Sequence, residues 1–181
     1  MKENTEAEDV TNKLVNKNCS INYVFAEQLN VKNAGGVTIN DVKIRFKLEN
    51  TIETSSVAPN PVSDGKYLRL AIVPVTDADT NKTLLPSNFD VQNATIYGLE
   101  DETWYPIDSE TKKPSTTELT ATSALATTEF NVNTLNAGQA KYYNIYVWYE
   151  GQDEDCFNYT AGAKLPDITF NVVGTPANAH G

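Results

Sequence analysis

The chain has 181 residues, enough for one large domain or for one domain with an arm, and 40% of them are hydrophobic. Its formal charge is −10, from 24 acidic and 14 basic residues, so it repels phosphate backbones and anionic lipid head groups, and we expect no nucleic-acid partner. The single histidine, His180, excludes a Ser-His-Asp triad and a multi-histidine zinc site, and no apolar stretch approaches the ~20 residues that span a bilayer.

Residues 1–20 differ from the rest of the chain in being polar and acidic, with one short apolar run inside "KLVNKN". A segment of this composition buries too little apolar surface to become ordered by itself. We therefore predict a flexible N-terminal arm, or a donor strand that becomes ordered only against a partner. The arm lacks the apolar core of a signal peptide, so the protein is either cytosolic or an exported protein whose leader has been removed.

From residue 21 onward, apolar and polar side chains alternate in short runs, which is typical of β-strands with one buried face. In "DVKIRFKL", Val42, Ile44 and Phe46 share one face, and two lysines and an arginine share the other. "KYLRLAIVPV" is mostly apolar on both faces, which predicts a buried central strand that ends near Pro74. Further strands are predicted in "INYVFAEQLNV", "NATIYGL", "TEFNVN", "YYNIYVWY" and "DITFNVV".

Turn-forming clusters such as Asn33-Ala34-Gly35-Gly36 and Asn136-Ala137-Gly138 separate these strands. Many short strands divided by turns predict an all-β fold, an antiparallel β-sandwich of jelly-roll or Greek-key type. We place this domain at residues 21–175, followed by a disordered tail at 176–181. Residues 76–116 alternate weakly and predict a long insertion between core strands, where binding surfaces often lie.

Two aromatic pairs, Trp104-Tyr105 and Trp148-Tyr149, can be interpreted in two ways. Exposed rings stack on sugars, whereas buried rings fill the space between and along sheets. We favour packing for both pairs, and we expect Trp148 to belong to the core.

An acidic loop follows the most aromatic strand, with Glu150, Asp153, Glu154 and Asp155 within six positions. Carboxylates bind Ca²⁺ when backbone carbonyls complete six to eight oxygen ligands. Nearly contiguous acids diverge on a turn, however, so a solvated turn is the alternative. Asp153 and Asp155 are the candidate Ca²⁺ ligands. We predict no other cofactor and assign no catalytic residue.

The two cysteines, Cys19 and Cys156, also have two interpretations. As a disulfide they would close a loop of 137 residues (156 − 19), which the chain-entropy model credits with roughly 5 kcal/mol. As separate residues they are two free thiols. Neither has a second cysteine at a spacing typical of zinc sites.

The segment "YNIYVWYEGQDEDC", residues 143–156, resembles the closing motif of a family of Firmicute exported proteins. Its distinctive residues are Trp148, Glu150-Gly151, Asp153 and Asp155-Cys156. These proteins are processed by the dedicated signal peptidase W, and they are the camelysin/TasA-like biofilm matrix proteins. "GKYLRLAIVPV", residues 65–75, is similar to the family's central strand, and "DITFNV" is similar to its last strand.

The resemblance implies a jelly-roll-like sandwich, export by the general secretory route with a leader absent from this sequence, and a place at the cell surface. Its best-understood members are similar to fibre subunits in which an N-terminal strand completes the sheet of the next protomer. Residues 5–20 would be that donor strand here. Because the chain has no His-Glu-x-x-His motif, the metalloprotease activity described for camelysin-like members does not transfer.

Together these patterns favour a non-enzymatic, secreted structural protein, a biofilm-matrix or cell-surface fibre subunit. Its expected partners are further copies of itself or other matrix components. The alternative is a surface adhesin or glycan-binding module that makes its contact through the insertion, with Trp104 and Tyr105. A hydrolase that uses two carboxylates is the third hypothesis.

Overall fold

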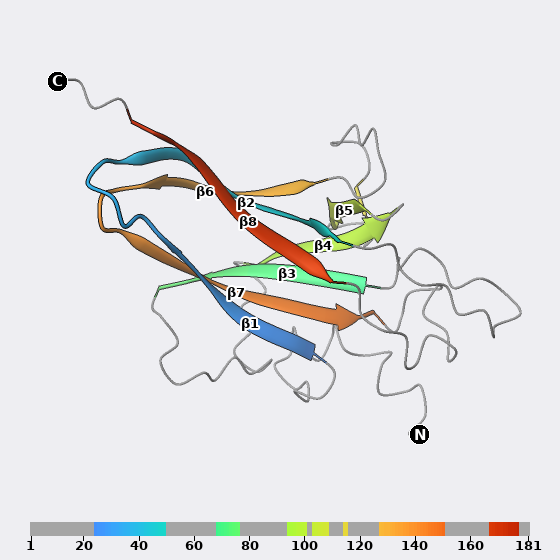
Figure 1. The fold of residues 1–181 in the computed structure, drawn as a ribbon. Coiled ribbons are helices and arrows are strands. Elements are labelled where there is room, and N and C mark those ends of the chain that lie inside the picture. Colours follow the sequence, from blue (N-terminus) through green and yellow to red (C-terminus); the bar gives the residue numbers. More distant parts are fainter. Residues whose placement is uncertain are drawn as a thin grey trace, which may run out of the picture.

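The computed structural model describes residues 24–49, 68–76, 94–100, 103–108, 114–115, 127–150 and 167–177 (Figure 1). These residues form strands and the turns between them, and none of them is helical. The strands are β1 (Val24–Lys32), β2 (Ile39–Leu48), β3 (Leu68–Val75), β4 (Thr95–Glu100), β5 (Thr103–Pro106), β6 (Thr128–Leu135), β7 (Ala140–Tyr149) and β8 (Ile168–Pro176). The predicted all-β class is confirmed.

The strands form two sheets that lie one above the other (Figure 1). The five-stranded sheet has the order β1-β7-β3-β4-β5, and the three-stranded sheet has the order β6-β2-β8. All of the pairings between these strands are antiparallel. The structure therefore confirms an antiparallel β-sandwich, whereas the jelly-roll subtype stays a prediction.

Strand β2 follows the predicted alternation. Val42, Ile44 and Phe46 are buried between the sheets, while the side chains between them point to solvent. On the solvent face, Lys43 and Arg45 bind Glu129 of β6, at 2.5 Å and 2.8 Å. Hydrogen bonds from Lys43 first and Arg45 second lower the pKa of the Glu129 carboxyl. These exposed pairs cover the solvent side of the three-stranded sheet.

Strand β3 is buried on both of its faces, as its sequence predicts, and it lies between β7 and β4. Leu70 and Ile72 belong to the core between the two sheets. Ala71 and Val73 point the other way and form a second cluster with Tyr146 and Trp148 of β7. Trp148 is only 1% exposed, which confirms that it is a core residue and not a surface ring.

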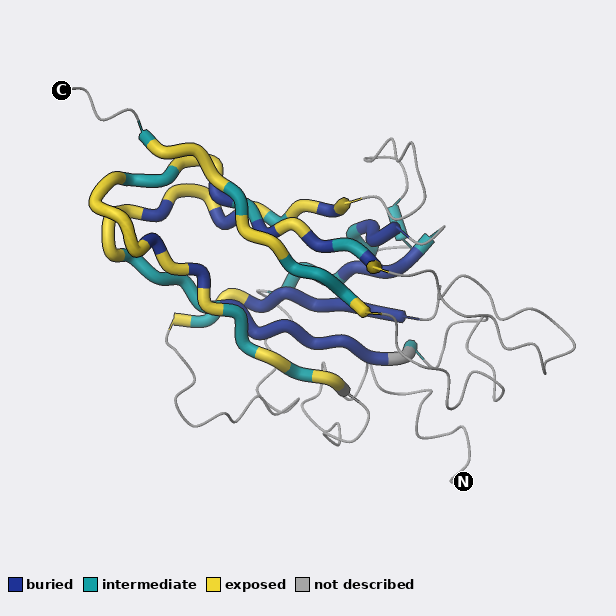
Figure 2. Tube along the Cα trace, in the orientation of Figure 1, coloured by how far each residue is buried: buried dark blue, intermediate teal, exposed yellow. Residues whose placement is uncertain are grey.

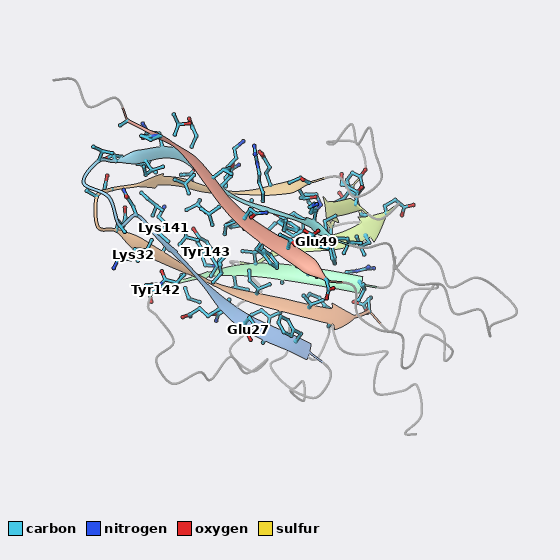
Figure 3. All side chains as sticks on the ribbon, viewed as in Figure 1. Glu27, Lys32, Glu49, Lys141, Tyr142 and Tyr143 are labelled. Atoms are coloured by element: carbon cyan, nitrogen blue, oxygen red, sulfur yellow. The ribbon has the colours of Figure 1, made fainter. Side chains whose placement is uncertain are left out.

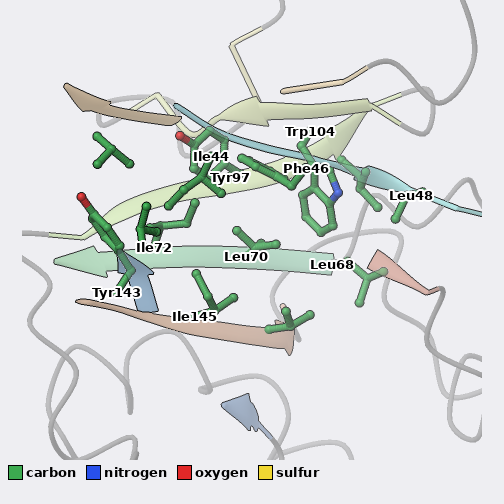
Figure 4. Packing of buried hydrophobic residues seen from close by; sticks show 14 of the residues in the cluster. Ile44, Phe46, Leu48, Leu68, Leu70, Ile72, Tyr97, Trp104, Tyr143 and Ile145 are labelled. Carbon is green, nitrogen blue, oxygen red and sulfur yellow. The ribbon is translucent and has the colours of Figure 1, made fainter. Parts of the chain in front are cut away.

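Aromatic rings fill the middle of the core between the sheets (Figure 4). The Phe46 ring contacts Tyr97 edge-on at 4.9 Å between centroids and lies parallel to Phe170 at 5.8 Å. Trp104 packs on the same ring at 6.5 Å. Burial among these side chains raises the pKa of Tyr97 to about 12, because the phenolate would be taken out of water.

The range 76–116, predicted as an insertion, contains β4 and β5, which extend the five-stranded sheet beyond β3. A strand was predicted at "NATIYGL", but β5 was not. Trp104 is fully buried and Tyr105 is 6% exposed, so this part of the range contributes to the core. A Cβ on Gly98 would lie 2.7 Å from Ile107 Cδ1 and 3.1 Å from Pro114 Cγ, so a larger residue here would have to displace these side chains.

Two predicted turns meet at one end of the sandwich and are joined by Asn33, which is 6% exposed. The Asn33 side chain donates to the carbonyl oxygens of Val37, Leu135 and Asn136 and accepts from the backbone N–H of Gly35. Its backbone N–H donates to the Gln139 carbonyl. One buried amide therefore connects the β1–β2 turn to the β6–β7 turn.

The chain ends differ slightly from the prediction. Strand β1 begins at Val24, and the arm at residues 1–20 lies outside the described residues. The predicted tail starts at residue 176, but Pro176 belongs to β8 and the Ala177 N–H donates to the Thr38 carbonyl at 2.8 Å. The described part of the chain thus continues to residue 177.

Candidate functional site

A groove lies between β1 and β8, the edge strands of the two sheets, with a volume of about 380 Å³. Most of its lining is apolar: Phe25, Leu29, Leu68, Ile145, Val147, Ile168 and Phe170. The remaining lining residues are Glu27, Gln28 and Asp167. The groove is thus an opening into the side of the sandwich core.

The unequal widths of the two sheets create this opening. Strands β2 and β6 contact β5 across the sandwich, so the three-stranded sheet lies over the β5 side of the five-stranded sheet. At its opposite edge, the three-stranded sheet ends with β8, which lies toward β7 and β1. Within the described residues, the three-stranded sheet therefore has no strand that lies over the inner face of β1.

The register of β1 shows which of its side chains the three-stranded sheet leaves uncovered. Phe25 pairs with Val147, and Glu27 pairs with Ile145. Because Val147 and Ile145 belong to the core cluster, Phe25 and Glu27 point to the same inner face. Phe25 is nevertheless 50% exposed, whereas Ile145 is 3% exposed. An inward-facing aromatic ring that remains half exposed marks a place where a covering element would bury apolar surface.

β8 shows the same pattern from the opposite sheet. Phe170 pairs with Phe46, and Val172 pairs with Ile44, so both point inward. Val172 is 47% exposed, although Ile44 is fully buried. In Figure 2, β8 is coloured as exposed or intermediate along its length, while β3 and most of β7 are buried. The open side of the sandwich therefore runs along β8 as well as β1.

β8 also differs from the other edge strands in its charge. Its sequence, "ITFNVVGTP", contains no acidic or basic residue over nine positions. Edge strands usually carry charges, prolines or bulges, or are very short, because their free N–H and C=O groups would otherwise pair with other chains. β1 has Glu27 pointing inward and Lys32, β6 has Glu129, and β5 has four residues. β8 has a proline only at its last position, Pro176, and a register shift against β2 only between Val173 and Thr175, so residues 168–172 carry none of these protections. Among the described residues, β8 pairs with β2 alone.

Two carboxylates give the groove its charge. Glu27 lies in the first half of β1 (Figure 3), and Asp167 directly precedes β8. The Asp167 carbonyl accepts from the Glu49 N–H at 2.9 Å, which fixes the start of β8 beside the end of β2. The described lining contains no basic residue. The groove is therefore apolar with an acidic border.

The residues proposed from the sequence as ligands and thiols, Asp153, Asp155, Cys19 and Cys156, lie outside the described residues. In the described ranges, no three His, Cys, Asp or Glu side chains lie together as a metal site would require. Cys19 precedes Val24 in the chain and Cys156 follows Trp148.

Val24 pairs with Trp148 in the β1–β7 ladder. The chain segments that lead to the two cysteines therefore leave the five-stranded sheet at the same end. Both interpretations of the cysteines remain open.

The aromatic residues proposed for glycan contact are described, and their rings are buried. Trp104 packs inside the core and Tyr105 is nearly inaccessible, so neither presents a ring to a sugar. The preferred interpretation, packing, is confirmed for Trp104, Tyr105 and Trp148. No described helix has the length and apolar character required to cross a bilayer.

Comparisons with known proteins identify no relative. No family model matches the chain, and neither the curated proteins nor the solved structures contain a match. The groove itself is thus the strongest indication of function. Sequence reasoning did not find it, because "DITFNVV" carries no charge after its first residue but the predicted strands "NATIYGL" and "YYNIYVWY" carry none at all, so lack of charge does not mark an edge strand.

Proposed function

We propose that this protein is a non-enzymatic extracellular structural protein, a biofilm-matrix or cell-surface fibre subunit, that assembles by β-strand addition. One observation carries the proposal: the uncharged edge strand β8 borders an apolar groove that opens into the core. The resemblance of residues 143–156 to the camelysin/TasA-like proteins supports the extracellular location.

Strand addition would use both features of the site. An incoming strand would hydrogen-bond to the backbone groups of β8 that point away from β2. Its alternate side chains would enter the groove and cover Phe25, and the same strand would cover Val172, which lies further along β8 outside the groove lining. Burying the exposed half of each of these side chains contributes about 1 kcal/mol apiece. The three-stranded sheet would then have a fourth strand over β1.

Residues 5–20 of a second copy are the proposed donor strand. They precede β1 in the sequence, and the second residue of β1, Phe25, lines the groove. Each copy therefore offers one arm and one groove. A head-to-tail contact of this kind does not close on itself unless the rotation between copies allows it, so it produces fibres.

A lysine at position 172 tests this proposal, because a charge on an edge strand opposes the addition of another strand. Val172→Lys should remain monomeric in analytical ultracentrifugation and negative-stain microscopy at concentrations where the wild type forms filaments. Val37→Lys is the matched control, since Val37 is 39% exposed in the β1–β2 turn, away from the groove lining. Val37→Lys should assemble as the wild type does.

Two results would contradict the proposed function. The first is a wild-type protein that stays monomeric at all accessible concentrations. The second is filament formation by Val172→Lys at the wild-type concentration. Thermal unfolding of both variants, followed by circular dichroism, ensures that assembly is compared between folded proteins.

A further inference from the structure

We propose that the groove selects its strand by charge: Glu27 and Asp167 pair with Lys13 and Lys17 of a second copy, and these lysines place residues 12–18 in the groove. The inference rests on the proposed function and specifies which part of the arm binds. It follows from the acidic border of the groove and from the distribution of charge along residues 1–20.

The position of Glu27 on the inner face of β1 is the main observation behind this inference. Its side chain shares the inner face of β1 with Phe25 and Leu29, which line the groove. The ion pairs formed between described residues join Lys43 and Arg45 to Glu129 and Lys47 to Glu49, all on or beside β2, and none of them includes Glu27.

A strand laid over Glu27 would take its carboxylate out of water. Burial of a carboxylate without a cation or hydrogen-bond donors is costly, whereas a paired carboxylate is tolerated. The same strand would approach Asp167, at the start of β8. An occupant that supplies positive charge is therefore favoured over a neutral one, and an acidic occupant is rejected.

Within the proposed donor, residues 5–20, only one stretch supplies that charge. Lys13 and Lys17 are its only basic residues, and they flank Leu14 and Val15 in the sequence "NKLVNKN". In an extended strand, Lys13, Val15 and Lys17 point to the same side, with the two lysines about 13 Å apart. An apolar side chain between two cations matches an apolar groove bordered by two acids.

The remainder of the donor has the opposite charge. Glu6, Glu8 and Asp9 precede Val10, so a shift that brought this part into the groove would place acids against Glu27 and Asp167. Like charges in contact oppose binding and exclude wrong registers. Charge therefore supplies the register that a short, Asn-rich strand cannot specify through side-chain packing alone.

A charge exchange between two full-length variants tests the inference. Glu27→Lys leaves one lysine and one acid in the groove against a basic arm, and Lys13→Glu/Lys17→Glu places an acidic arm against the two acids of the groove. At low salt, each variant alone should need at least a tenfold higher concentration than the wild type to form filaments. An equimolar mixture should assemble at a lower concentration than either variant alone, because the basic arm then meets the groove with two acids and the acidic arm meets the groove that carries a lysine.

Glu100→Lys is the matched control, since it makes the same charge change on β4, outside the groove lining. It should assemble as the wild type does. High salt should reduce the differences between the variants, because the Debye length falls to about 3 Å at 1 M.

The possible results separate this inference from the function on which it rests. Assembly of both groove variants at the wild-type concentration would overturn the charge pairing, while the failure of Val172→Lys to assemble would still support strand addition. A mixture that assembles no better than its components would also overturn the pairing. A wild-type protein that never assembles would overturn the proposed function and this inference together.

Discussion

Replacing Asn33 with alanine should destabilise the protein more than any other single change at an exposed turn, because Asn33 joins two turns from inside the structure. Its amide nitrogen lies 2.8 Å from the Val37 carbonyl oxygen and 3.1 Å from those of Leu135 and Asn136. Its amide oxygen accepts from the Gly35 N–H at 3.0 Å. The side chain thus connects β1 and β2 to β6 and β7, and so joins the two sheets.

The expected loss follows from the number of bonds. An amide NH₂ has two protons, so at most two of the three carbonyl contacts are full hydrogen bonds at one time. Together with the accepted bond, Asn33→Ala removes about three hydrogen bonds, each with a net contribution of about 1 kcal/mol. A loss of about 3 kcal/mol corresponds to a decrease in Tm of about 6 to 12 °C for a chain of this size.

Urea unfolding followed by circular dichroism measures this loss, with Asn30→Ala as the control. Asn30 is exposed on β1, and its side chain makes no hydrogen bond with the residues that the structure describes, so its replacement should change the free energy of unfolding by less than about 0.5 kcal/mol. Asn33→Asp keeps the shape and the acceptor but loses the donors, and it should be at least as unstable as Asn33→Ala. An Asn33→Asp protein as stable as the wild type, or an Asn33→Ala loss below 0.5 kcal/mol, would refute this reasoning.

Two further predictions concern buried aromatic residues. Because burial raises the pKa of Tyr97 to about 12, against an ordinary value of 10, the neutral phenol stabilises the folded state fully below pH 10, and this contribution disappears as the pH rises to 12. At about 1.36 kcal/mol per pKa unit, the two-unit difference is worth about 2.7 kcal/mol, and the wild type should lose most of it relative to Tyr97→Phe between pH 9 and pH 12 in urea unfolding, so equal losses would contradict the assignment. Trp148→Ala removes a ring that is 1% exposed and should cost about 3 to 5 kcal/mol, so a melting temperature unchanged from the wild type would show that Trp148 is not part of the core.

The arrangement of charge on the edge strands gives a physical reason why the proposed assembly would be directional. Glu27 points inward on β1 and discourages pairing at that edge, whereas β8 has no charge along its length. In the proposed assembly, one edge of the groove would repel an added strand and the other would accept it. The same carboxylate that protects β1 would then become a recognition group for a basic strand paired with β8.

The strands and their class follow from local sequence. Alternation fixes the inner and outer faces of β2, since a side-chain period of two places Val42 and Ile44 opposite Lys43 and Arg45 whatever lies next to the strand. The two-faced apolar pattern of residues 68–73 likewise predicts a central position for β3, and the structure places it between β7 and β4. Both predictions depend only on the order of residues along one segment.

The groove, the role of Asn33 and the burial of Trp104 depend on which segments meet. Periodicity identifies the two faces of a strand, but it does not show whether the strand pairs with one neighbour or with two. "DITFNVV" would have the same pattern at the edge of a sheet as in the middle. β8 is an edge because the three-stranded sheet ends there, and Asn33 is buried because a turn more than 100 residues later folds against it. These are consequences of long-range pairing, in which the free energy of one segment depends on the position of another, and a single stretch of sequence does not contain that information.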